Sequence, residues 1–527
     1  MTNQLQSLKE SYDKFPYKSY PFPKSTPLHL RTLGTFFGMN PPEIKHARVL
    51  EIGCASGGNI IPLAVQYPDA HFLGIELSDV QASAGNDFIK KLGLTNISIK
   101  SCSITELDES LGQYDYIIAH GVYSWVTDDV REKILQICKE NLSPSGIAYI
   151  SYNTLPGWNT LSSIRDMALY HAKNFTLPEE QINQTKMLLN FISESIKASE
   201  TSYAKLMMES VEMLKNKPDY YIAHDFLEIN NKAFYLSEFV DQVKSKSLQY
   251  LSDADISNMY LPNYSDAIAE KLGEINDLVR MEQYLDFTIN RTFRCSLICH
   301  DDVPINREIG PDRMINFYLK QIVVSEKTEK DEDLTKSNIE SIFYLDYNQT
   351  NTVTTTDNVL KAMLYSFQGA GGFISFDSLL ALVVSKLPKQ ESNNLKINLE
   401  GALLNLFMRG TLKLSTDPIN VNTFSTALPK AWSYAMNQCK LSDESIVTNL
   451  YHQTVSLSLF ETYMIRYIDG TRSKEQVIEK MLEHVKQGDL EANYGGKKLT
   501  SDEKIRNILS LAYLDAIDKF RDNALLV

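Results

Sequence analysis

A glycine-rich turn between two acidic residues is the part of this sequence best suited to chemistry. Residues 48–58 read Arg-Val-Leu-Glu-Ile-Gly-Cys-Ala-Ser-Gly-Gly, which predicts a buried strand running into a turn. Glycine is needed where a backbone passes close to a ligand or takes a positive φ. Glu51 lies within this motif, and Glu76 ends the next predicted strand. The combination predicts a nucleoside site in which the Glu76 carboxylate accepts both ribose hydroxyls.

The spacing of the turn favours S-adenosylmethionine over a dinucleotide. Dinucleotide enzymes space their glycines G-x-G-x-x-G and place a pyrophosphate on the following helix N-terminus. Here the spacing is E-x-G-x-x-x-G-G. The Glu51 carboxylate would repel a pyrophosphate, whereas it suits the ammonium and sulfonium groups of S-adenosyl-L-methionine, whose product is S-adenosyl-L-homocysteine. The residues expected to contact this cofactor are Tyr17, Tyr20, Glu51, Gly53, Cys54, Ala55, Gly57, Gly58, Asn59, Glu76, Leu77, Ser103, Ile104 and His120.

The residues at the end of the fourth predicted strand indicate which class of substrate is methylated. Enzymes that methylate planar nitrogens carry Asn-Pro-Pro-Tyr there, whereas this chain has Ala119-His-Gly-Val-Tyr, which disfavours that class. Aromatic side chains surround the predicted site instead, and aromatic faces attract cations and pack on methylene chains such as that of lysine. An apolar channel beside a sulfonium would lower the lysine pKa, so no strong base is needed. The candidate catalytic residues are His120, Tyr123, Trp125, Tyr152, Asn153 and Trp158.

Each of these candidates has a structural alternative. The aromatic side chains could pack in the core, and His120 could hold backbone geometry instead of moving a proton.

The elements that must position these residues follow an alternating pattern of strands and helices, which predicts a parallel α/β sheet. Strands are expected at 48–52, 71–75, 97–101, 115–120 and 146–152. A helical pattern then covers about 160–216, and two further strands follow, one within 239–252 and one at 292–300. We infer a helical insertion that interrupts the core before its last two strands.

The segments outside this core differ in composition. A proline and aromatic cluster at 12–24 cannot form a regular helix, because each proline removes a donor, and we expect it to lie as an extended cap over the cofactor site. Segments 316–325 and 342–347 are predicted to pair as strands. Helical patterns at 357–367, 375–387 and 394–409 suggest a winged-helix-like unit, and in the last region Ser473 and Glu475 mark a helix start. The expected domains are an N-terminal cap at 1–46, a cofactor-binding core at 47–159, a helical insertion at 160–232, the last core strands at 233–302, a winged-helix-like domain at 303–420 and a helical domain at 421–527.

Composition bounds the remaining possibilities. The net charge of −14 and the pI near 5.3 disfavour a nucleic-acid partner, because phosphate binding needs a basic surface. The six cysteines form no C-x-x-C pair and are typical of reduced thiols. A metal site from Cys295, Cys299 and His300 is the alternative, but adjacent strand residues point to opposite faces, so no metal is expected. Without a signal peptide or a long apolar run, we expect a cytoplasmic protein with no membrane insertion.

Longer motifs carry a family resemblance. They are Tyr12-Asp-x-x-Pro-Tyr-x-Ser, Tyr221-Ile-Ala-His-Asp-Phe-Leu-Glu228-x-Asn-x-x-x-Phe-Tyr-x-x-Glu-Phe, Leu248-Gln-Tyr-Leu and Gln283-Tyr-Leu-Asp-Phe-x-x-Asn-Arg-x-Phe-Arg. Residues 46–160 resemble class I S-adenosylmethionine-dependent methyltransferases, and these motifs resemble bacterial methyltransferases that bear a regulatory domain. The whole chain is similar to rickettsial protein-lysine methyltransferases that modify an outer membrane protein.

The resemblance sharpens the expected fold and function. The fold class is α/β: a Rossmann-like class I methyltransferase sheet with a helical insertion, plus C-terminal α+β winged-helix-like and helical domains. The resemblance implies methylation of lysine ε-amines on a protein substrate, an outer membrane protein, by a homodimer formed through the helical insertion. A small-molecule methyltransferase with the same cofactor, and a catalytically idle binding module that uses the fold as a scaffold, are the alternatives.

Overall fold

The computed structural model describes residues 9, 12–14, 16–228, 230–327, 329, 334, 336, 339–387, 394–422, 426–442, 444–494 and 497–527. Residues 1–8, with which the predicted cap begins, lie outside the described residues.

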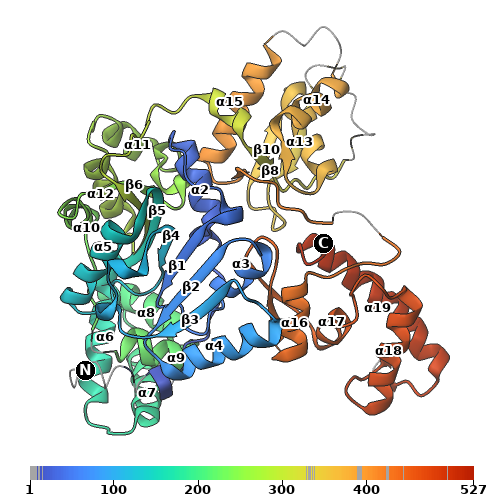
Figure 1. Cartoon of the computed structure of the whole chain (residues 1–527), viewed down its shortest axis with the longest axis horizontal. Coiled ribbons are helices and arrows are strands. Elements are labelled where there is room, and N and C mark those ends of the chain that lie inside the picture. The colour runs from blue at the N-terminus through green and yellow to red at the C-terminus, as the bar shows by residue number, and fades with distance from the viewer. Residues whose placement is uncertain are drawn as a thin grey trace.

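A seven-stranded sheet forms the centre of the protein (Figure 1). Its strands are β1 (Arg48–Ile52), β2 (His71–Glu76), β3 (Ile97–Ser101), β4 (Tyr114–Ala119), β5 (Leu142–Asn153), β6 (Leu248–Asp253) and β7 (Phe293–His300). Their order is β3-β2-β1-β4-β5-β7-β6, and β7 runs antiparallel to both of its neighbours. The expected α/β fold is confirmed, and the predicted strands agree with β1 to β5, except that β5 begins earlier, at Leu142.

Helices cover both faces of the sheet because successive strand residues point to opposite faces. The covering helices are α2 (Pro27–Phe36), α3 (Ile60–Gln66), α4 (Asp79–Leu92), α5 (Asp128–Asn141), α10 (Leu236–Lys244) and α12 (Leu278–Ile289). Val49 and Tyr149 belong to the core with α2, α3 and α4, whereas Leu50 and Ile150 belong to the core with α5 and α10. By the same alternation, Glu51 of β1 points to the α3 face.

The helical insertion lies between β5 and β6, as predicted. It consists of α6 (Trp158–Ala172), α7 (Pro178–Ile196) and α8 (Ser202–Lys215), followed by α9 (Asp219–Tyr221) and a π-helical turn at Ile222–Phe226. Ile164, Leu189 and Val211, one from each long helix, are buried in a small apolar core of its own. The insertion therefore packs as a separate layer below the sheet in the view of Figure 1.

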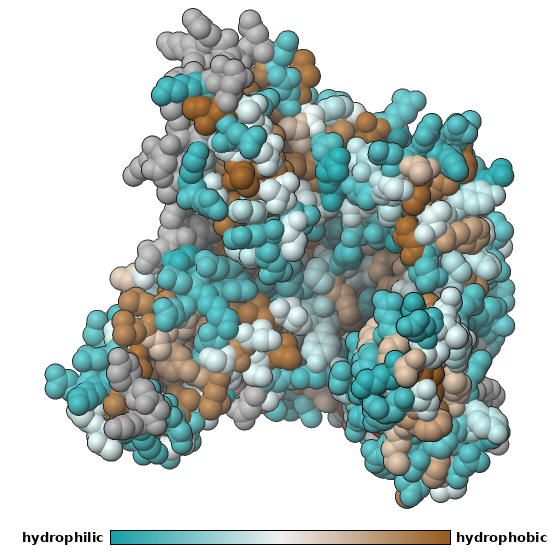
Figure 2. All heavy atoms as spheres, turned by 180° about the vertical axis from the view of Figure 1, so that it is seen from behind, coloured by the Kyte–Doolittle hydropathy of each residue, from teal (hydrophilic) through white to brown (hydrophobic). Residues whose placement is uncertain are grey.

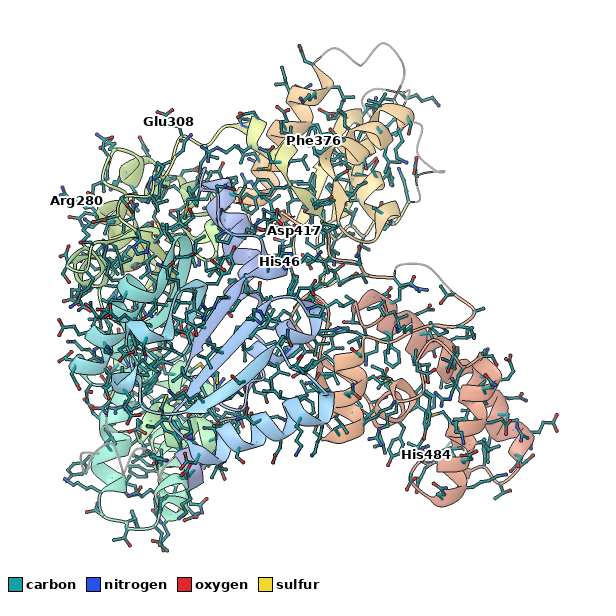
Figure 3. The ribbon with its side chains drawn as sticks, viewed as in Figure 1. His46, Arg280, Glu308, Phe376, Asp417 and His484 are labelled. Carbon is teal, nitrogen blue, oxygen red and sulfur yellow. The ribbon has the colours of Figure 1, made fainter. Side chains whose placement is uncertain are left out.

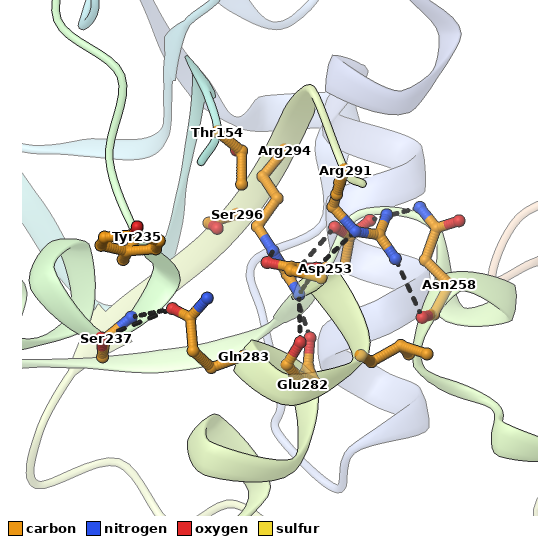
Figure 4. Close-up of polar contacts among 12 residues, drawn as sticks. Thr154, Tyr235, Ser237, Asp253, Asn258, Glu282, Gln283, Arg291, Arg294 and Ser296 are labelled. Atoms are coloured by element: carbon orange, nitrogen blue, oxygen red, sulfur yellow. Dashed lines mark hydrogen bonds and ion pairs between the residues drawn. The ribbon is translucent and has the colours of Figure 1, made fainter. Parts of the chain in front are cut away.

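A buried ion cluster joins the last two strands to α12 (Figure 4). The guanidinium of Arg294 in β7 bonds Glu282 Oε2 and Asp286 Oδ2, each at 2.8 Å, and all three side chains are fully buried. Arg291 Nε bonds Asp286 Oδ1 at 2.6 Å, and Asp253 Oδ2 lies 3.5 Å from Arg294 Nη1. Burial raises the pKa of Glu282 and of Asp253, and the Arg294 charge opposes this rise. The arginines of the 283–294 motif thus hold β6, β7 and α12 together.

The middle domain packs helices against a short sheet. Its elements are β8 (Tyr318–Lys320), β9 (Ser341–Tyr344), β10 (Thr352–Thr355), α13 (Asn358–Ala370), β11 (Ile374–Ser375), α14 (Phe376–Lys386), α15 (Leu395–Met408) and β12 (Lys413–Ser415). The predicted pairing of 316–325 with 342–347 is confirmed only in part, because β8 pairs with β11 and β12 while β9 pairs with β10. A single bridge, Val324 to Tyr344, joins the two segments. Asp417, which follows β12 and is labelled in Figure 3, bonds Arg31 of α2 at 2.6 Å.

The C-terminal domain combines helices with short hairpins. Its elements are α16 (Ser433–Leu441), β13 (Ile446–Thr448), β14 (Thr454–Ser456), α17 (Leu459–Ile465), α18 (Lys474–Gln487), β15 (Asn493–Tyr494), β16 (Lys497–Lys498) and α19 (Asp502–Asp522). Ser473 caps α18 through a reciprocal pair of hydrogen bonds with Gln476, so the predicted helix start is confirmed. Among the described residues, none of the helices combines the length and apolarity that a membrane span requires.

Replacing Arg294 by methionine tests the contribution of the buried ion cluster. The Glu282 and Asp286 carboxylates would lose their cation while staying buried, so we expect the free energy of unfolding to fall by roughly 3–5 kcal/mol in urea denaturation. Arg506→Met removes an exposed ion pair with Glu479 and serves as the control, which should change little. An Arg294→Met protein as stable as the control would contradict this role of the cluster.

Candidate active site

The glycine-rich turn lies at the carboxyl ends of β1 and β2, where open α/β sheets bind their ligands. Gly53 has a φ of +71°, and its N–H donates to the Ile75 carbonyl oxygen at 2.8 Å. A Cβ on Gly53 would lie 2.5 Å from Val122 Cγ2, and one on Gly58 would lie 2.5 Å from the Ser19 carbonyl oxygen. The turn needs glycine at these two positions because neighbouring segments of chain approach it closely.

Glu76 holds the turn from the end of β2. Its Oε2 accepts a hydrogen bond from the Ala55 N–H at 2.8 Å, and its Oε1 accepts one from the Ser78 N–H at 2.9 Å. Burial raises the pKa of Glu76, and these two hydrogen bonds oppose the rise. Each carboxylate oxygen keeps acceptor capacity, so Glu76 can also accept hydroxyls of a ribose. Leu77, the next residue, is half-buried.

Glu51 is a buried carboxylate whose second oxygen has no protein partner. Its Oε1 accepts from Asn59 Nδ2 at 2.8 Å, whereas its Oε2 is buried without a hydrogen bond within the described residues. Burial raises the pKa of Glu51 to about 8, the Asn59 hydrogen bond opposes this, and the Glu76 charge adds to it. An ammonium group beside Oε2 would favour the ionised carboxylate. Glu51 and Glu76 together therefore fit the ammonium and ribose ends of S-adenosylmethionine.

The segment before α2 lies across this turn. The N–H of Gly58 donates to Ser19 Oγ at 2.7 Å, and the N–H of Phe22 donates to Asn59 Oδ1 at 2.8 Å. The Phe22 ring lies 3.6 Å, centroid to centroid, from the His120 ring. The segment thus lies against the glycine-rich turn, and its role as a cap over the cofactor stays a prediction.

Tyr17 joins this segment to the helical insertion. Its hydroxyl donates to Asp225 Oδ1 at 3.3 Å, and its ring lies 5.0 Å from the His224 ring. His224 also stacks on Tyr12, with centroids 4.9 Å apart. Tyr20 is half-buried in the same segment. Contact of Tyr17 and Tyr20 with the cofactor stays a prediction, since the contacts described for Tyr17 are with the insertion.

The residues predicted on the adenine side follow β3. Ser103 is buried, and its Oγ lies 2.8 Å from Thr105 Oγ1 and accepts from the Thr105 N–H. The Ser103 hydroxyl therefore caps a short turn that begins at Ile104, which is half-buried. Cys54 is buried against β2, because a Cβ on Gly74 would lie 2.5 Å from its sulfur.

His120 follows β4 and is held as a neutral ring. Its Nδ1 lies 2.9 Å from the Tyr149 hydroxyl, which donates to Cys295 Sγ at 2.9 Å. In the tautomer in which Nδ1 carries the ring proton and donates to Tyr149, the Nε2 lone pair is left for a ligand. Burial lowers the pKa of His120 to about 4. Phe293, 40% exposed, lies 6.1 Å away and completes an aromatic surface.

Tyr123 and Tyr152 lie in the core, away from this surface. Both pack on Phe239 of α10, with centroids 5.6 and 4.3 Å away, and neither is more than 1% exposed. The Tyr123 hydroxyl donates to Gln242 at 2.6 Å, and the Tyr152 hydroxyl lies 3.0 Å from Ser296 Oγ. The aromatic side chains that surround the site therefore do not include Tyr123 or Tyr152. Strand alternation points Tyr152 to the α10 face, opposite to Tyr149.

Trp125, Trp158 and Asn153 form a separate group at the end of β5. The two indole rings pack edge to face with centroids 6.1 Å apart. Trp158 Nε1 and Asn153 Nδ2 are buried donors that have no hydrogen-bond acceptor within the described part of the chain. Unpaired buried donors are costly. The catalytic role of these residues stays a prediction.

Sequence analysis missed the contacts that come from distant segments. Phe22 belongs to the predicted cap, but its contact with His120 depends on how that cap folds. Tyr149 and Cys295 meet only because β7 lies beside β5. His452 of the C-terminal domain lies 2.8 Å from Asn59 Oδ1, and no local pattern marks it.

Three family models match the chain. A "Methyltransferase domain" matches residues 49–146, a "Predicted methyltransferase regulatory domain" matches 218–300, and a "PKMT, C-terminal winged helix domain" matches 428–525. The first covers the glycine-rich turn, and the second covers the buried ion cluster. The winged helix model falls on the C-terminal domain, whereas sequence analysis placed a winged-helix-like unit at 303–420.

The similar proteins include two that match this chain over almost its full length. An uncharacterized protein of Rickettsia prowazekii (strain Madrid E) is 41% identical over 517 residues, covering 98% of this chain and 93% of that protein. The structure of PKMT2 from Rickettsia typhi in complex with AdoHcy is 33% identical, has a TM-score of 0.89, and covers 97% of this chain and 100% of that chain. The expected cofactor is confirmed, since AdoHcy is S-adenosylhomocysteine. The chain belongs to the PKMT family of S-adenosylmethionine-dependent methyltransferases, which joins a methyltransferase domain, a regulatory domain and a C-terminal winged helix domain.

Proposed function

We propose that this protein transfers methyl groups from S-adenosylmethionine to lysine ε-amines of a protein substrate. The observation that carries the proposal is the neutral His120 ring, which contacts Phe22 and lies near the exposed Phe293 at the strand ends beside the glycine-rich turn. This surface offers aromatic faces to a methylene chain and an acceptor to an amine. The PKMT name of the family supports a lysine substrate, and the resemblance points to an outer membrane protein.

The aromatic surface favours the reactive form of the amine. A lysine ammonium must lose its proton before its nitrogen can attack a methyl group, and apolar surroundings lower its pKa. His120 Nε2 accepts an N–H hydrogen bond and so directs the amine lone pair, while the proton passes to solvent because a pKa near 4 makes His120 a weak base. When bound, S-adenosylmethionine supplies an activated methyl group and leaves as S-adenosylhomocysteine.

The carboxylates beside the turn bind the cofactor in this proposal. Glu76 accepts the ribose hydroxyls while its backbone hydrogen bonds fix its orientation. Glu51 pairs with the ammonium group through Oε2, which no described residue contacts by a hydrogen bond. Gly53 and Gly58 let the backbone approach the ligand.

The helical insertion is the surface through which we propose that two copies associate. Met187 and Phe191 of α7 and Leu206 of α8 are 61%, 67% and 51% exposed. Hydrophobic side chains stand among hydrophilic ones on this part of the surface, at the lower right of Figure 2. Sedimentation should give a dimer that Phe191→Glu converts to a monomer, and a monomeric wild-type protein would contradict the proposal.

Glu76→Ala tests the cofactor site. The variant loses a charged acceptor for two hydroxyls, so its affinity for S-adenosylmethionine should fall roughly 10- to 100-fold by calorimetry. Glu109→Ala removes an exposed carboxylate on a separate turn and should bind like the wild type. Undiminished binding by Glu76→Ala would remove Glu76 from the site.

Incubation with labelled donor and bacterial outer membrane protein tests the substrate. We expect label on lysine side chains, located by mass spectrometry, together with formation of S-adenosylhomocysteine. His120→Phe keeps an aromatic ring but loses the acceptor, so kcat should fall about tenfold or more. Label on a small metabolite alone would overturn the lysine assignment, and no turnover with any acceptor would favour an idle binding module.

A further inference from the structure

The C-terminal domain reaches the glycine-rich turn through the loop between β13 and β14. This loop places His452 Nε2 2.8 Å from Asn59 Oδ1 and leaves the histidine only 3% exposed. His452 has a φ of +59°, a left-handed conformation that few residues with a Cβ adopt. Asn449 Oδ1 holds the loop by accepting the N–H groups of Tyr451 and Gln453, at 2.9 and 2.8 Å. The loop conformation is thus fixed so that it presents His452 to the turn.

Asn59 connects His452 to the Glu51 carboxylate. Asn59 Nδ2 donates to Glu51 Oε1 at 2.8 Å, and Asn59 Oδ1 accepts the Phe22 N–H at 2.8 Å. Because a backbone N–H can only donate, the oxygen of the amide faces Phe22, and His452 must donate to the same oxygen through Nε2–H. Burial lowers the pKa of His452 to about 3, which keeps the ring neutral with its proton on Nε2. His452 is therefore a second donor that fixes the plane of the Asn59 amide.

The same loop also contacts the middle domain. Lys320 Nζ lies 3.3 Å from the centroid of the Tyr451 ring, and the Phe373 ring lies 6.0 Å from it. The C-terminal domain is thus held on two sides, by Asn59 of the methyltransferase domain and by the middle domain. The loop that places His452 beside Asn59 is therefore the same loop through which the C-terminal domain contacts the middle domain.

We infer that His452 is a positioning residue for cofactor binding: through Asn59 it holds the Glu51 carboxylate where the ammonium group of S-adenosylmethionine binds. This inference rests on the proposed role of Glu51. Asn59 Nδ2 also donates to Ser25 Oγ at 3.1 Å, so loss of the His452 donor loosens the Asn59 amide without freeing it and weakens the hydrogen bond that orients Glu51 Oε1. The C-terminal domain then has a defined part in the enzyme, since it completes the cofactor site from a loop far along the chain.

A matched pair of variants separates the hydrogen bond from the strained backbone. His452→Leu and His452→Gln have side chains of similar size and the same left-handed φ, but only Gln can donate to Asn59. In the full chain, His452→Leu should bind S-adenosylhomocysteine about tenfold more weakly by calorimetry, and His452→Gln should stay within about threefold of the wild type. Equal losses in the two variants, or no loss in His452→Leu, would overturn the inference.

A double-mutant cycle with Glu51→Gln shows whether His452 acts through Glu51. Glu51→Gln alone should weaken binding about tenfold. If His452 acts through Glu51, His452→Leu in the Glu51→Gln background should cost less than about threefold, because coupled sites are not additive. Full additivity would overturn the inference and leave the role of Glu51 intact, whereas wild-type affinity of Glu51→Gln would instead refute that proposed role.

Two further variants test whether a general disturbance of the loop, and not the loss of the His452 hydrogen bond, weakens binding. Tyr451→Phe alters the same loop but removes a buried hydroxyl that has no hydrogen bond within the described residues, so its affinity should be unchanged. A loss in Tyr451→Phe equal to that in His452→Leu would mean that loop disturbance alone weakens binding, against the inference. If His452→Leu does not fold, His452→Asn takes its place, since asparagine tolerates a positive φ but is too short to reach Asn59.

Discussion

Glu51 lies beneath the glycine-rich turn with one carboxylate oxygen bonded to Asn59 and the other without a hydrogen bond to any described residue. A buried carboxylate is costly unless hydrogen bonds or a cation compensate it. The fold supplies part of this compensation through Asn59, and in the proposed function the ammonium group of the cofactor supplies the rest. Two other features of the site follow from the need to keep the Glu51 carboxylate in one position. The Asn59 amide must be fixed, and water must be kept from the turn.

Segments from both ends of the chain meet this requirement. The N-terminal segment covers the turn and donates the Phe22 N–H to Asn59, and the C-terminal domain donates from His452. At the other edge of the sheet, the Arg294 cluster holds β7 to β6 and α12. The pairing of β7 with β5 brings Cys295 to the Tyr149 hydroxyl, which contacts His120. Segments of the accessory domains therefore contact residues beside the glycine-rich turn of the methyltransferase domain.

Features that depend on contacts between residues near in sequence could be predicted, whereas features that depend on contacts between distant segments could not. The strands β1 to β5 and the pairing of the turn with Glu76 follow from spacing, and the structure agrees. The face to which a strand residue points was misjudged for Tyr152, which packs on α10. The pairing of 316–325 with 342–347 was correct at only one bridge, because strand propensity does not identify the neighbouring strand. The contact of His452 with Asn59 depends on domain docking, which no short motif records.

The pH dependence of S-adenosylhomocysteine binding tests the central claim most directly. The pKa of Glu51 in the free protein is raised to about 8. An ammonium partner lowers this pKa, so below about pH 8 ligand binding releases the Glu51 proton. Affinity measured by calorimetry should rise between about pH 6 and pH 8, by up to tenfold per pH unit, and Glu51→Gln should remove that rise. An affinity that does not change with pH, or one that changes equally in Glu51→Gln, would contradict the account.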